Sequence, residues 1–316
     1  MIRRILARRE SYIIVLTFLL WGIISTMNRN FAMPSYLLEL IGFNSVYIIG
    51  ALGVLPLMIK GNFDLSIGAM ITSVSFFLVV IHGYLQLPIY LILFMGLILG
   101  SLLGLMNGFF ISYYKIPSVI VTLASMSLFS GMTKFMNRTW SLRGTSLQPI
   151  SVPVLWIENM MIILMLIVTY SLLKYHPLGR AIYAFGGDEK LAIKKGYPLQ
   201  KTTLFVHAFS GLSAGLAAVI HFITFGRPSI DAYVGIEFEL IIIVIIGGLH
   251  ILGGYGTVLG TFSASLFVVV LKSGLVFARI PVFWHDMVIG VIIILVVSYD
   301  MLKYHKYEKR LMRQGE

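Results

Sequence analysis

The sequence predicts an all-α polytopic membrane protein, because three features of its composition and patterning differ from those of a soluble fold. Of its 316 residues, 58% are hydrophobic and 12% are charged, whereas soluble domains carry about 25% charged residues. The apolar residues form long runs of the kind that an α-helix needs to cross a bilayer core of about 30 Å. The net charge of +11 comes from basic residues gathered at the ends of those runs, a pattern typical of membrane orientation rather than of nucleic-acid binding.

About ten apolar runs are predicted to cross the membrane, and they place residues 1–316 in a single transmembrane domain. Several are shorter than the roughly 17 to 25 residues of a typical span, so the number is approximate. Arginines precede the first run, but no small-residue cleavage site follows it, so we interpret it as a retained span and not as a secretory signal. In chain order the runs are Tyr12–Met27, Ser45–Ile59, Ser66–Ile81, Pro88–Tyr113, Ser118–Phe135, Asn159–Tyr175, Thr203–Thr224, Phe238–Leu249, Thr257–Ala278 and Val282–Tyr299.

The basic residues predict the orientation of these spans. If the N-terminus lies in the cytoplasm, most Lys and Arg residues fall in cytoplasmic segments, as the positive-inside rule requires. An even number of spans then places both basic termini inside, so that the topology is N-in and C-in. The segment His176–Lys201 becomes cytoplasmic, and Met136–Glu158 becomes the largest external loop.

The segment 176–201 is a charged island between two long apolar runs, and it is predicted to contain a short helix in water. Asp188 is a suitable N-cap, Glu189 lies in the first turn, Lys194 lies in the last turn and Gly196 can end the helix. A helix of about seven residues is only about 10 Å long and cannot span a bilayer. We expect either a contact surface for another protein or a solvated basic loop without a partner.

Two glycine-rich breaks interrupt the apolar pattern, at Gly61–Gly68 and at Gly247–Gly256. Irregular backbone at membrane depth is tolerated where it is buried in protein or lines a wet cavity, so such breaks can mark a transport pathway. The alternative is a pair of tight turns between helices.

Two polar residues lie within or beside these apolar runs and need a structural or functional reason. Asp64 would cost about 2.5–3.5 kcal/mol at the centre of a span. It is expected to cap a helix beginning at Leu65 or to line a wet pathway, and these roles are compatible. Asn107 is followed by Gly108, which favours close helix packing.

Charged residues near the outer end of the eighth run are candidates for docking an external partner. Glu237 and Glu239 begin this run, and Arg227 and Asp231 lie just before it. These residues either pair with one another or meet a partner outside. Lys272, inside a later run, is expected to reach the membrane surface or to pair with an acid.

Several chemistries lack support in the sequence. The absence of cysteine excludes disulfides and thiolate metal sites, and the seven histidines form no H-E-x-x-H pair. Gly211–Gly215 fits the nucleophile pattern G-x-S-x-G through Ser213, but inside an apolar helical run it favours a small-residue packing face. There is no Gly-Lys dipeptide and hence no Walker A loop, so any ATP would bind another subunit. No catalytic residue, cofactor or metal site is expected.

Together these segments resemble the membrane permease subunits of bacterial ATP-binding cassette (ABC) importers for monosaccharides, the ribose and autoinducer-2 permease group. The resemblance covers most of the chain. It departs at Asn62 and Phe63, which widen the spacing before Asp64, and at Leu249-His250 and Lys272. The segments that carry it are Gly61–Gly68, Leu105–Gly108, Ile116–Leu123, Gly179–Asp188 with Gly196, Glu239-Leu240, Gly247-Gly248 and Gly253–Thr261.

The resemblance implies a non-catalytic subunit that imports a ribose-like or autoinducer-2-like sugar across the bacterial cytoplasmic membrane. A nucleoside importer is the alternative, and an intramembrane enzyme or a stand-alone channel is more remote. The implied partners are a cytoplasmic ABC ATPase, an external substrate-binding protein, a second permease subunit and the lipid bilayer, but no nucleic acid.

The resemblance and the residue patterns together give three groups of candidate residues. Contact with the ATPase is expected at Gly187, Asp188, Glu189, Lys190, Ala192 and Gly196. The pathway, or a structural break beside it, is expected at Asn62, Asp64, Ser66, Asn107, Gly247, Gly248, Gly253 and Gly254. Docking at the outer face is expected at Arg227, Glu237 and Glu239.

Overall fold

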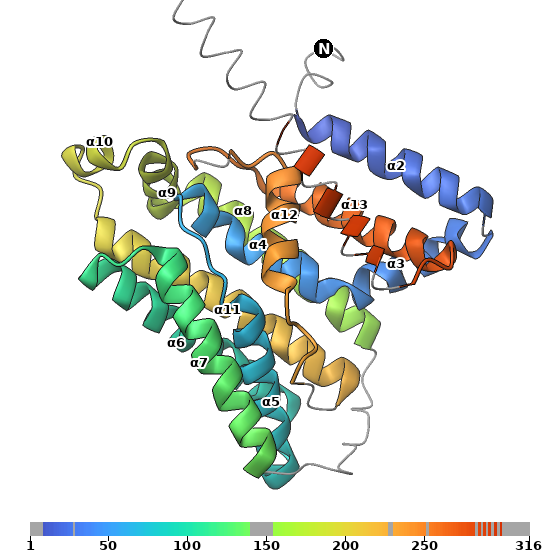
Figure 1. Ribbon diagram of the computed structural model, residues 1–316, viewed down its shortest axis with the longest axis horizontal. Coiled ribbons are helices and arrows are strands. Elements are labelled where there is room, and N and C mark those ends of the chain that lie inside the picture. The colour runs from blue at the N-terminus through green and yellow to red at the C-terminus, as the bar shows by residue number, and fades with distance from the viewer. Residues whose placement is uncertain are drawn as a thin grey trace, which may run out of the picture.

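The structure, a computed structural model, describes residues 9–27, 29–139, 154–226, 230–250 and 253–281 and scattered positions between 284 and 298 (Figure 1). Within these residues the regular elements are all helices, as the sequence predicts. In chain order they are α2 (Arg9–Met27), η1 (Arg29–Ala32), α3 (Pro34–Phe43), α4 (Ser45–Ile59), α5 (Ile67–Leu85), α6 (Ile89–Tyr114), α7 (Ser118–Thr139), α8 (Val154–Tyr175), α9 (Pro177–Gly187), α10 (Glu189–Lys194), α11 (Leu199–Phe225), α12 (Ile236–Ile246) and α13 (Val258–Phe277).

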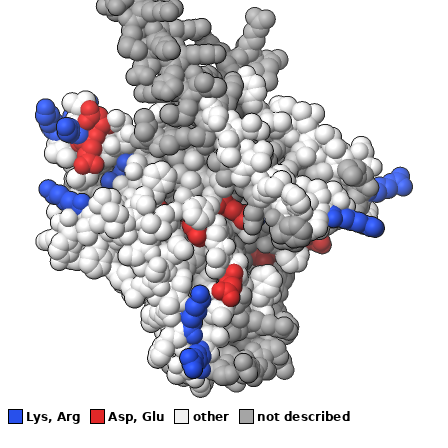
Figure 2. Space-filling model, viewed as in Figure 1, with Lys and Arg blue, Asp and Glu red and all other residues white. Residues whose placement is uncertain are grey.

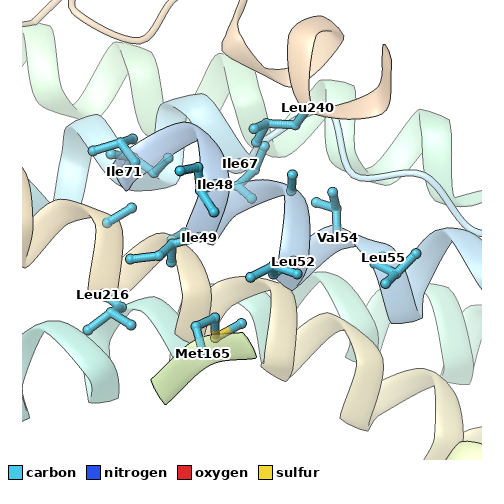
Figure 3. Close-up of a cluster of buried hydrophobic side chains, with 14 of the residues drawn as sticks. Ile48, Ile49, Leu52, Val54, Leu55, Ile67, Ile71, Met165, Leu216 and Leu240 are labelled. Atoms are coloured by element: carbon cyan, nitrogen blue, oxygen red, sulfur yellow. The ribbon is translucent and has the colours of Figure 1, made fainter. Parts of the chain in front are cut away.

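Helix α4 forms the centre of the hydrophobic core. All of its residues except Tyr47 are buried, which fits a helix that is apolar on every side. It packs against α8, α11, α12 and α13. Figure 3 shows side chains of α4, among them Ile49 and Leu52, lying between Leu216 of α11, Met165 of α8 and Leu240 of α12.

Helices α6 and α11 pack against each other along a face of small residues. A Cβ atom at Gly100 would overlap the carbonyl oxygen of Gly211, and a Cβ atom at Gly215 would overlap that of Gly96. Glycine at these positions lets the two backbones approach closely, as in other membrane helix pairs. The prediction that Gly211–Gly215 is a packing face is therefore confirmed.

The number of candidate membrane spans is smaller than the sequence predicted. Six described helices are long and apolar enough to cross a membrane, or seven if α3 and α4, bent by 59°, form one span. Helix α12 has 11 residues, a length of about 16 Å. The predicted run Val282–Tyr299 lies largely outside the described residues. The expectation of about ten spans is therefore not established by these helices.

The ends of the bundle differ in charge. Helices α4, α6 and α8 end, and α7 and α11 begin, at the end where α9 and α10 lie, whereas α5 begins nearer the middle of the bundle (Figure 1). Acidic and basic side chains gather at the upper left of Figure 2, where Figure 1 places α10, and much of the remaining visible surface is uncharged. This distribution suits a protein whose middle faces hydrocarbon.

Candidate coupling and translocation site

We call residues 176–201 the coupling segment. The short helix predicted within it is present as α10. The Asp188 carboxylate accepts a hydrogen bond from the backbone N–H of Leu191 at 2.9 Å, which makes Asp188 the N-cap. Gly196 has a φ of +82°, a left-handed conformation that glycine adopts without strain just beyond the helix end. The predicted cap and stop are confirmed, and the helix has six residues instead of about seven.

Helix α10 presents a mixed charged and apolar surface. Asp188, Glu189 and Lys190 are exposed. Leu191 and Ile193 are also exposed, at 53% and 48% of their surface. Exposed apolar side chains framed by charges are typical of a contact surface for another protein.

One face of α10 is fixed to the rest of the chain. Ala192 is only 2% exposed and packs in a small cluster with Ala181 and Phe185 of α9. The Phe185 ring lies 6.4 Å, between centroids, from the ring of Tyr197. This cluster packs the buried side of α10 against α9.

The end of α9 meets both glycine-rich breaks at one point, which we call the glycine junction (Gly186, Ile59 and Gly254). The backbone N–H of Gly254 donates to the carbonyl oxygen of Ile59, at the end of α4, at 2.8 Å. A Cβ atom at Gly186 would overlap both groups of that hydrogen bond. Gly61 at the start of the first break and Gly253-Gly254 in the second, far apart in sequence, therefore lie together beside the end of α9.

Two further side chains attach α9 to this junction. The Tyr183 hydroxyl donates to the Gly256 carbonyl at 2.7 Å, and burial raises the pKa of Tyr183 to about 12. The Lys60 ammonium lies 5.7 Å from the centroid of the Phe185 ring. Burial lowers the pKa of Lys60, and the nearby Glu189 carboxylate partly opposes that shift.

The loop that follows Ile59 takes part in a buried set of hydrogen bonds, which we call the Asp64 network (Asp64, Ser66, Asn107, Ser125 and Ser210). One Asp64 oxygen accepts from the Ser66 backbone N–H at 2.9 Å and from the Ser66 hydroxyl at 2.6 Å, and the other accepts from Ser210 at 3.0 Å. Asn107 donates to the Ser66 hydroxyl at 2.8 Å and accepts from Ser125 at 2.5 Å. All five residues are at most 6% exposed, so the network joins the 60–66 loop to α6, α7 and α11 inside the protein.

The geometry refines the role predicted for Asp64. Helix α5 begins at Ile67 with Ser66 as N-cap, not at Leu65 as expected, because the Asp64 carboxylate organises the turn before the helix. The predicted close packing at Asn107-Gly108 is present, since a Cβ atom at Gly108 would lie 3.1 Å from Leu204 and from His207. Asn107 itself bonds across helices, which the sequence did not reveal.

Three buried polar residues were not recognised in the sequence: Ser125 and Ser210 of the network, and His207 beside Asn62. The His207 Nε2 atom lies 3.1 Å from the Asn62 amide nitrogen, and Asn62 accepts from Lys60 at 3.4 Å. His207 and Ser210 are spaced three residues apart in an otherwise apolar run and share one face of α11. That spacing of polar residues is the signal that could have identified them.

The second break is a compact reversal between α12 and α13. Gly248 and Gly253 have φ values of +93° and +87°. A Cβ atom at Gly247 would lie 2.8 Å from the Thr261 backbone. The His250 N–H donates to the Tyr255 carbonyl at 3.1 Å. Glycine is therefore required here by backbone conformation and by close helix packing.

Two of the three residues expected at the outer face, Glu237 and Glu239, lie within the described part of the chain. Arg227 lies outside the described residues. Glu237 is 3% exposed. Glu239 accepts a hydrogen bond from Lys272, whose ammonium lies 4.3 Å from the centroid of the Tyr47 ring. The predicted pairing of Lys272 with an acid is confirmed, whereas docking of an external partner to these carboxylates stays a prediction.

Ser213 has the surroundings of a structural residue. It is fully buried, its hydroxyl donates to the Ser210 carbonyl at 2.7 Å, and a Cβ atom at Gly53 would overlap it. A serine nucleophile requires a neighbouring base and space for a substrate. The close contact with Gly53 leaves no such space, so the arrangement gives no support to an intramembrane enzyme.

The helical bundle, its apolar surface and the exposed coupling segment define a membrane transport subunit. The chain belongs to the family described as "Branched-chain amino acid transport system / permease component", whose profile matches residues 36–297. It is therefore a permease component and not an enzyme, as predicted, and a multi-pass protein of the bacterial inner membrane.

Several relatives of this chain carry the name "Autoinducer 2 import system permease protein LsrC". The protein from Photorhabdus laumondii is 26% identical over 326 residues, which cover 99% of this chain and 96% of the relative. The protein from Escherichia coli is 26% identical over 322 residues, covering 99% and 93%. The protein from Yersinia enterocolitica is 23% identical over 299 residues, covering 92% and 82%. No solved structure matches the chain.

Proposed function

We propose that this chain is the permease subunit of an ABC importer that carries a small sugar-like molecule into a bacterial cell. A separate cytoplasmic ATPase supplies the energy, since the chain has no Walker A loop of its own. An external binding protein delivers the substrate, and a second permease subunit, identical or related, completes the pathway. The glycine junction is the observation that carries the proposal, because it connects α9, on which the exposed helix α10 packs, to both breaks in the bundle.

A sugar related to autoinducer 2 is the substrate class that we favour. The relatives named for autoinducer 2 import align over nearly the whole chain. The family description instead mentions branched-chain amino acids. The nearly full-length alignment favours the substrate named for these relatives, and a nucleoside stays the alternative.

The proposed topology has about ten spans with both termini in the cytoplasm. The loops that contain Lys60 and Lys115 lie at the same end of the bundle as α10, since the Phe63 N–H donates to Ser118 at 3.1 Å and Lys60 contacts Phe185. Lys174 and Arg180 lie at this end as well. A concentration of basic residues at one end supports the assignment of that end to the cytoplasm.

The proposed mechanism is a mechanical linkage from α10 to the two breaks. Closure of the ATPase moves α10, and Ala192 and Phe185 transmit that motion to α9. The glycine junction passes it to the end of α4 and to the 253–256 turn, and the Asp64 network holds the adjoining loop against α6, α7 and α11. In this scheme Gly187 to Lys190 contact the ATPase and Ala192 and Gly196 shape the helix. Asn62, Asp64, Ser66, Asn107, Gly247, Gly248, Gly253 and Gly254 control the pathway.

The test is a pair of single charge reversals at exposed positions on opposite ends of the bundle. Glu189→Lys alters the contact helix, whereas Lys134→Glu alters the far end of α7. We expect Glu189→Lys to assemble with the ATPase yet lose at least about tenfold in uptake per ATP hydrolysed, because an interfacial charge reversal costs on the order of 1.4 kcal/mol or more. Lys134→Glu should behave as the natural protein. Equal coupling in both variants, measured as sugar uptake and ATPase rate in vesicles, would exclude α10 as the contact.

A further inference from the structure

A cavity of about 660 Å³ lies at the end of the bundle opposite α10, between the first turn of α4, the first turns of α8 and the last turns of α11. Its polar lining comprises Ser45, Tyr47, Glu158, His221, Thr224 and Tyr233. We call it the Glu158 cavity. Its volume falls within the range of about 300–1,000 Å³ that is usual for small-molecule sites.

The polar groups of the Glu158 cavity are buried and oriented by their neighbours. Glu158 is 5% exposed, and one carboxylate oxygen accepts from the Thr224 hydroxyl at 2.7 Å. The other oxygen packs against Gly42 of α3, where a Cβ atom would lie 2.6 Å away. His221 Nδ1 and the Tyr233 hydroxyl lie 2.7 Å apart. These contacts fix the side chains before any ligand arrives.

Ser45 is the independent sign that this cavity receives a polar molecule. Its residue exposure is 1%, yet its hydroxyl has no hydrogen-bond partner among the residues that the structure describes. A buried polar atom without a partner costs about 1–3 kcal/mol, so such groups are normally satisfied. Ser45 is one of the residues that line the cavity, so a ligand hydroxyl beside it could satisfy this group.

The chemistry of the lining selects among ligands. Glu158 is the charged residue of the described lining, which contains neither Lys nor Arg. A free amino acid or an inorganic anion would therefore bring a negative group without a cationic partner. Neutral hydroxyl groups can donate to the carboxylate and exchange hydrogen bonds with histidine, serine and tyrosine, and the Tyr47 and Tyr233 rings can cover the apolar face of a sugar.

We infer that the Glu158 cavity binds a neutral polyhydroxylated molecule, such as a pentose-sized sugar, on the extracytoplasmic side of the permease. This inference rests on the proposed function for its sidedness and names the substrate site of the same pathway. The cavity also adjoins the first break, because a Cβ atom at Gly68 in the first turn of α5 would overlap the Tyr233 carbonyl. The site therefore lies against the turn that the Asp64 network organises.

The natural absence of cysteine allows a direct test by labelling. Ser45→Cys places a thiol at the unpartnered position. Ser75→Cys in α5 is the matched control, since Ser75 is also buried, at 2% exposure, and also lacks a partner, but does not line this cavity. The assembled importer is studied in right-side-out vesicles with a membrane-impermeant thiosulfonate. We expect Ser45→Cys to react at least about tenfold faster than Ser75→Cys, because a thiol must be exposed to water and ionised to react.

The class of ligand is then identified by which compounds protect Ser45→Cys from labelling. Millimolar D-ribose, D-xylose or autoinducer 2 should slow labelling of Ser45→Cys, whereas leucine and inorganic phosphate should not. Adding Glu158→Gln or Tyr233→Phe should raise the protecting sugar concentration by about tenfold, the effect of losing one good hydrogen bond. Labelling as slow as at position 75, labelling only in inverted vesicles, or protection by leucine or phosphate but by none of the sugars would each overturn the inference.

Protection by none of these compounds would overturn the inference as well. Because this readout does not depend on ATP, it is separate from the test of coupling. If Glu189→Lys uncouples transport and Ser45→Cys is unprotected, the cavity assignment fails while the permease function stands. If Ser45→Cys is protected by a sugar and Glu189→Lys remains coupled, the proposed contact of α10 fails alone.

Discussion

The coupling segment and the Asp64 network obtain their order in opposite ways. Helix α10 is capped by a hydrogen bond between residues three apart, and its end is set by the adjacent Gly196. In the Asp64 network, Asp64 bonds to Ser210, which lies 146 residues away. The first is a local structure that sequence chemistry can specify. The second exists only when four separate parts of the chain have packed together.

This difference has a functional consequence. A locally capped helix keeps its shape while it is exposed, so it can present a defined surface to a partner. A buried network is stable only when all of its members are satisfied, so it ties the position of one helix to that of the others. The glycine junction lies between the two and joins them.

The largest expected effect is at the glycine junction, which connects the coupling segment to the Asp64 network. Gly186→Val places side-chain atoms against the backbone of Ile59 and Gly254. Backbone atoms cannot move aside cheaply, so we expect a loss of about 3 kcal/mol of stability, measured as detergent-resistant folded protein and thermal midpoint.

Gly187→Val is the matched control for that variant, because no atom lies within 4 Å of a Cβ built at Gly187. It should fold normally and reduce only contact with the ATPase. If both valine variants fold equally well, the junction is not the rigid link that the contacts indicate.

A smaller effect is expected inside the Asp64 network. Asp64→Ala leaves the Ser66 N–H, the Ser66 hydroxyl and the Ser210 hydroxyl without their acceptor. Each buried donor left unsatisfied costs about 1–3 kcal/mol before the structure relaxes, so we expect a net loss of about 2 kcal/mol in thermal unfolding.

Asp64→Asn separates the role of the negative charge from that of the hydrogen bonds. It keeps one carbonyl oxygen for both bonds to Ser66, and its amide can donate an N–H to Ser210. Its stability should lie close to that of the natural protein. A loss as large as that of Asp64→Ala would mean that the charge, and not the hydrogen-bonded turn, is what the site requires.

The smallest effect is expected at Tyr183, which attaches the coupling segment to the second break. Tyr183→Phe removes one hydrogen bond to Gly256 and should cost about 1 kcal/mol at neutral pH. The folded-state pKa of Tyr183 is raised to about 12. Its stabilising contribution is therefore complete below the ordinary tyrosine pKa near 10 and declines as pH rises toward the folded-state value.

The stability difference between the natural protein and Tyr183→Phe should therefore be larger at about pH 9 than at about pH 11.5, in denaturation experiments on the detergent-solubilised protein. A difference that does not change over this interval would show that the Tyr183 hydroxyl is not held in the buried hydrogen bond to Gly256.

Sequence patterns predicted several elements closely, and their failures have a common origin. Ser45–Ile59 was predicted with the bounds that α4 has, because it is a continuous apolar run between polar residues. Helix α5 was placed at Leu65, two residues early, because the Asp64 carboxylate forms a turn before the helix. The count of about ten spans stays a prediction, since six or seven spans are found among the described helices and α12 and the bent α3–α4 pair do not follow the simple rule of one apolar run for each crossing.

By itself, the sequence determined the all-helical membrane class, the Asp188 cap, the Gly196 stop and the small-residue face of α11. These follow from hydrophobic runs and from hydrogen bonds or packing faces that span only a few residues. The tertiary structure alone decided that the two breaks meet at Gly186, that Asp64 bonds to Ser210, that Lys272 pairs with Glu239 and that a polar cavity forms around Glu158. These contacts join residues that are tens to more than a hundred positions apart. They depend on which helix faces pack together, and a pattern of neighbouring residues does not specify that packing.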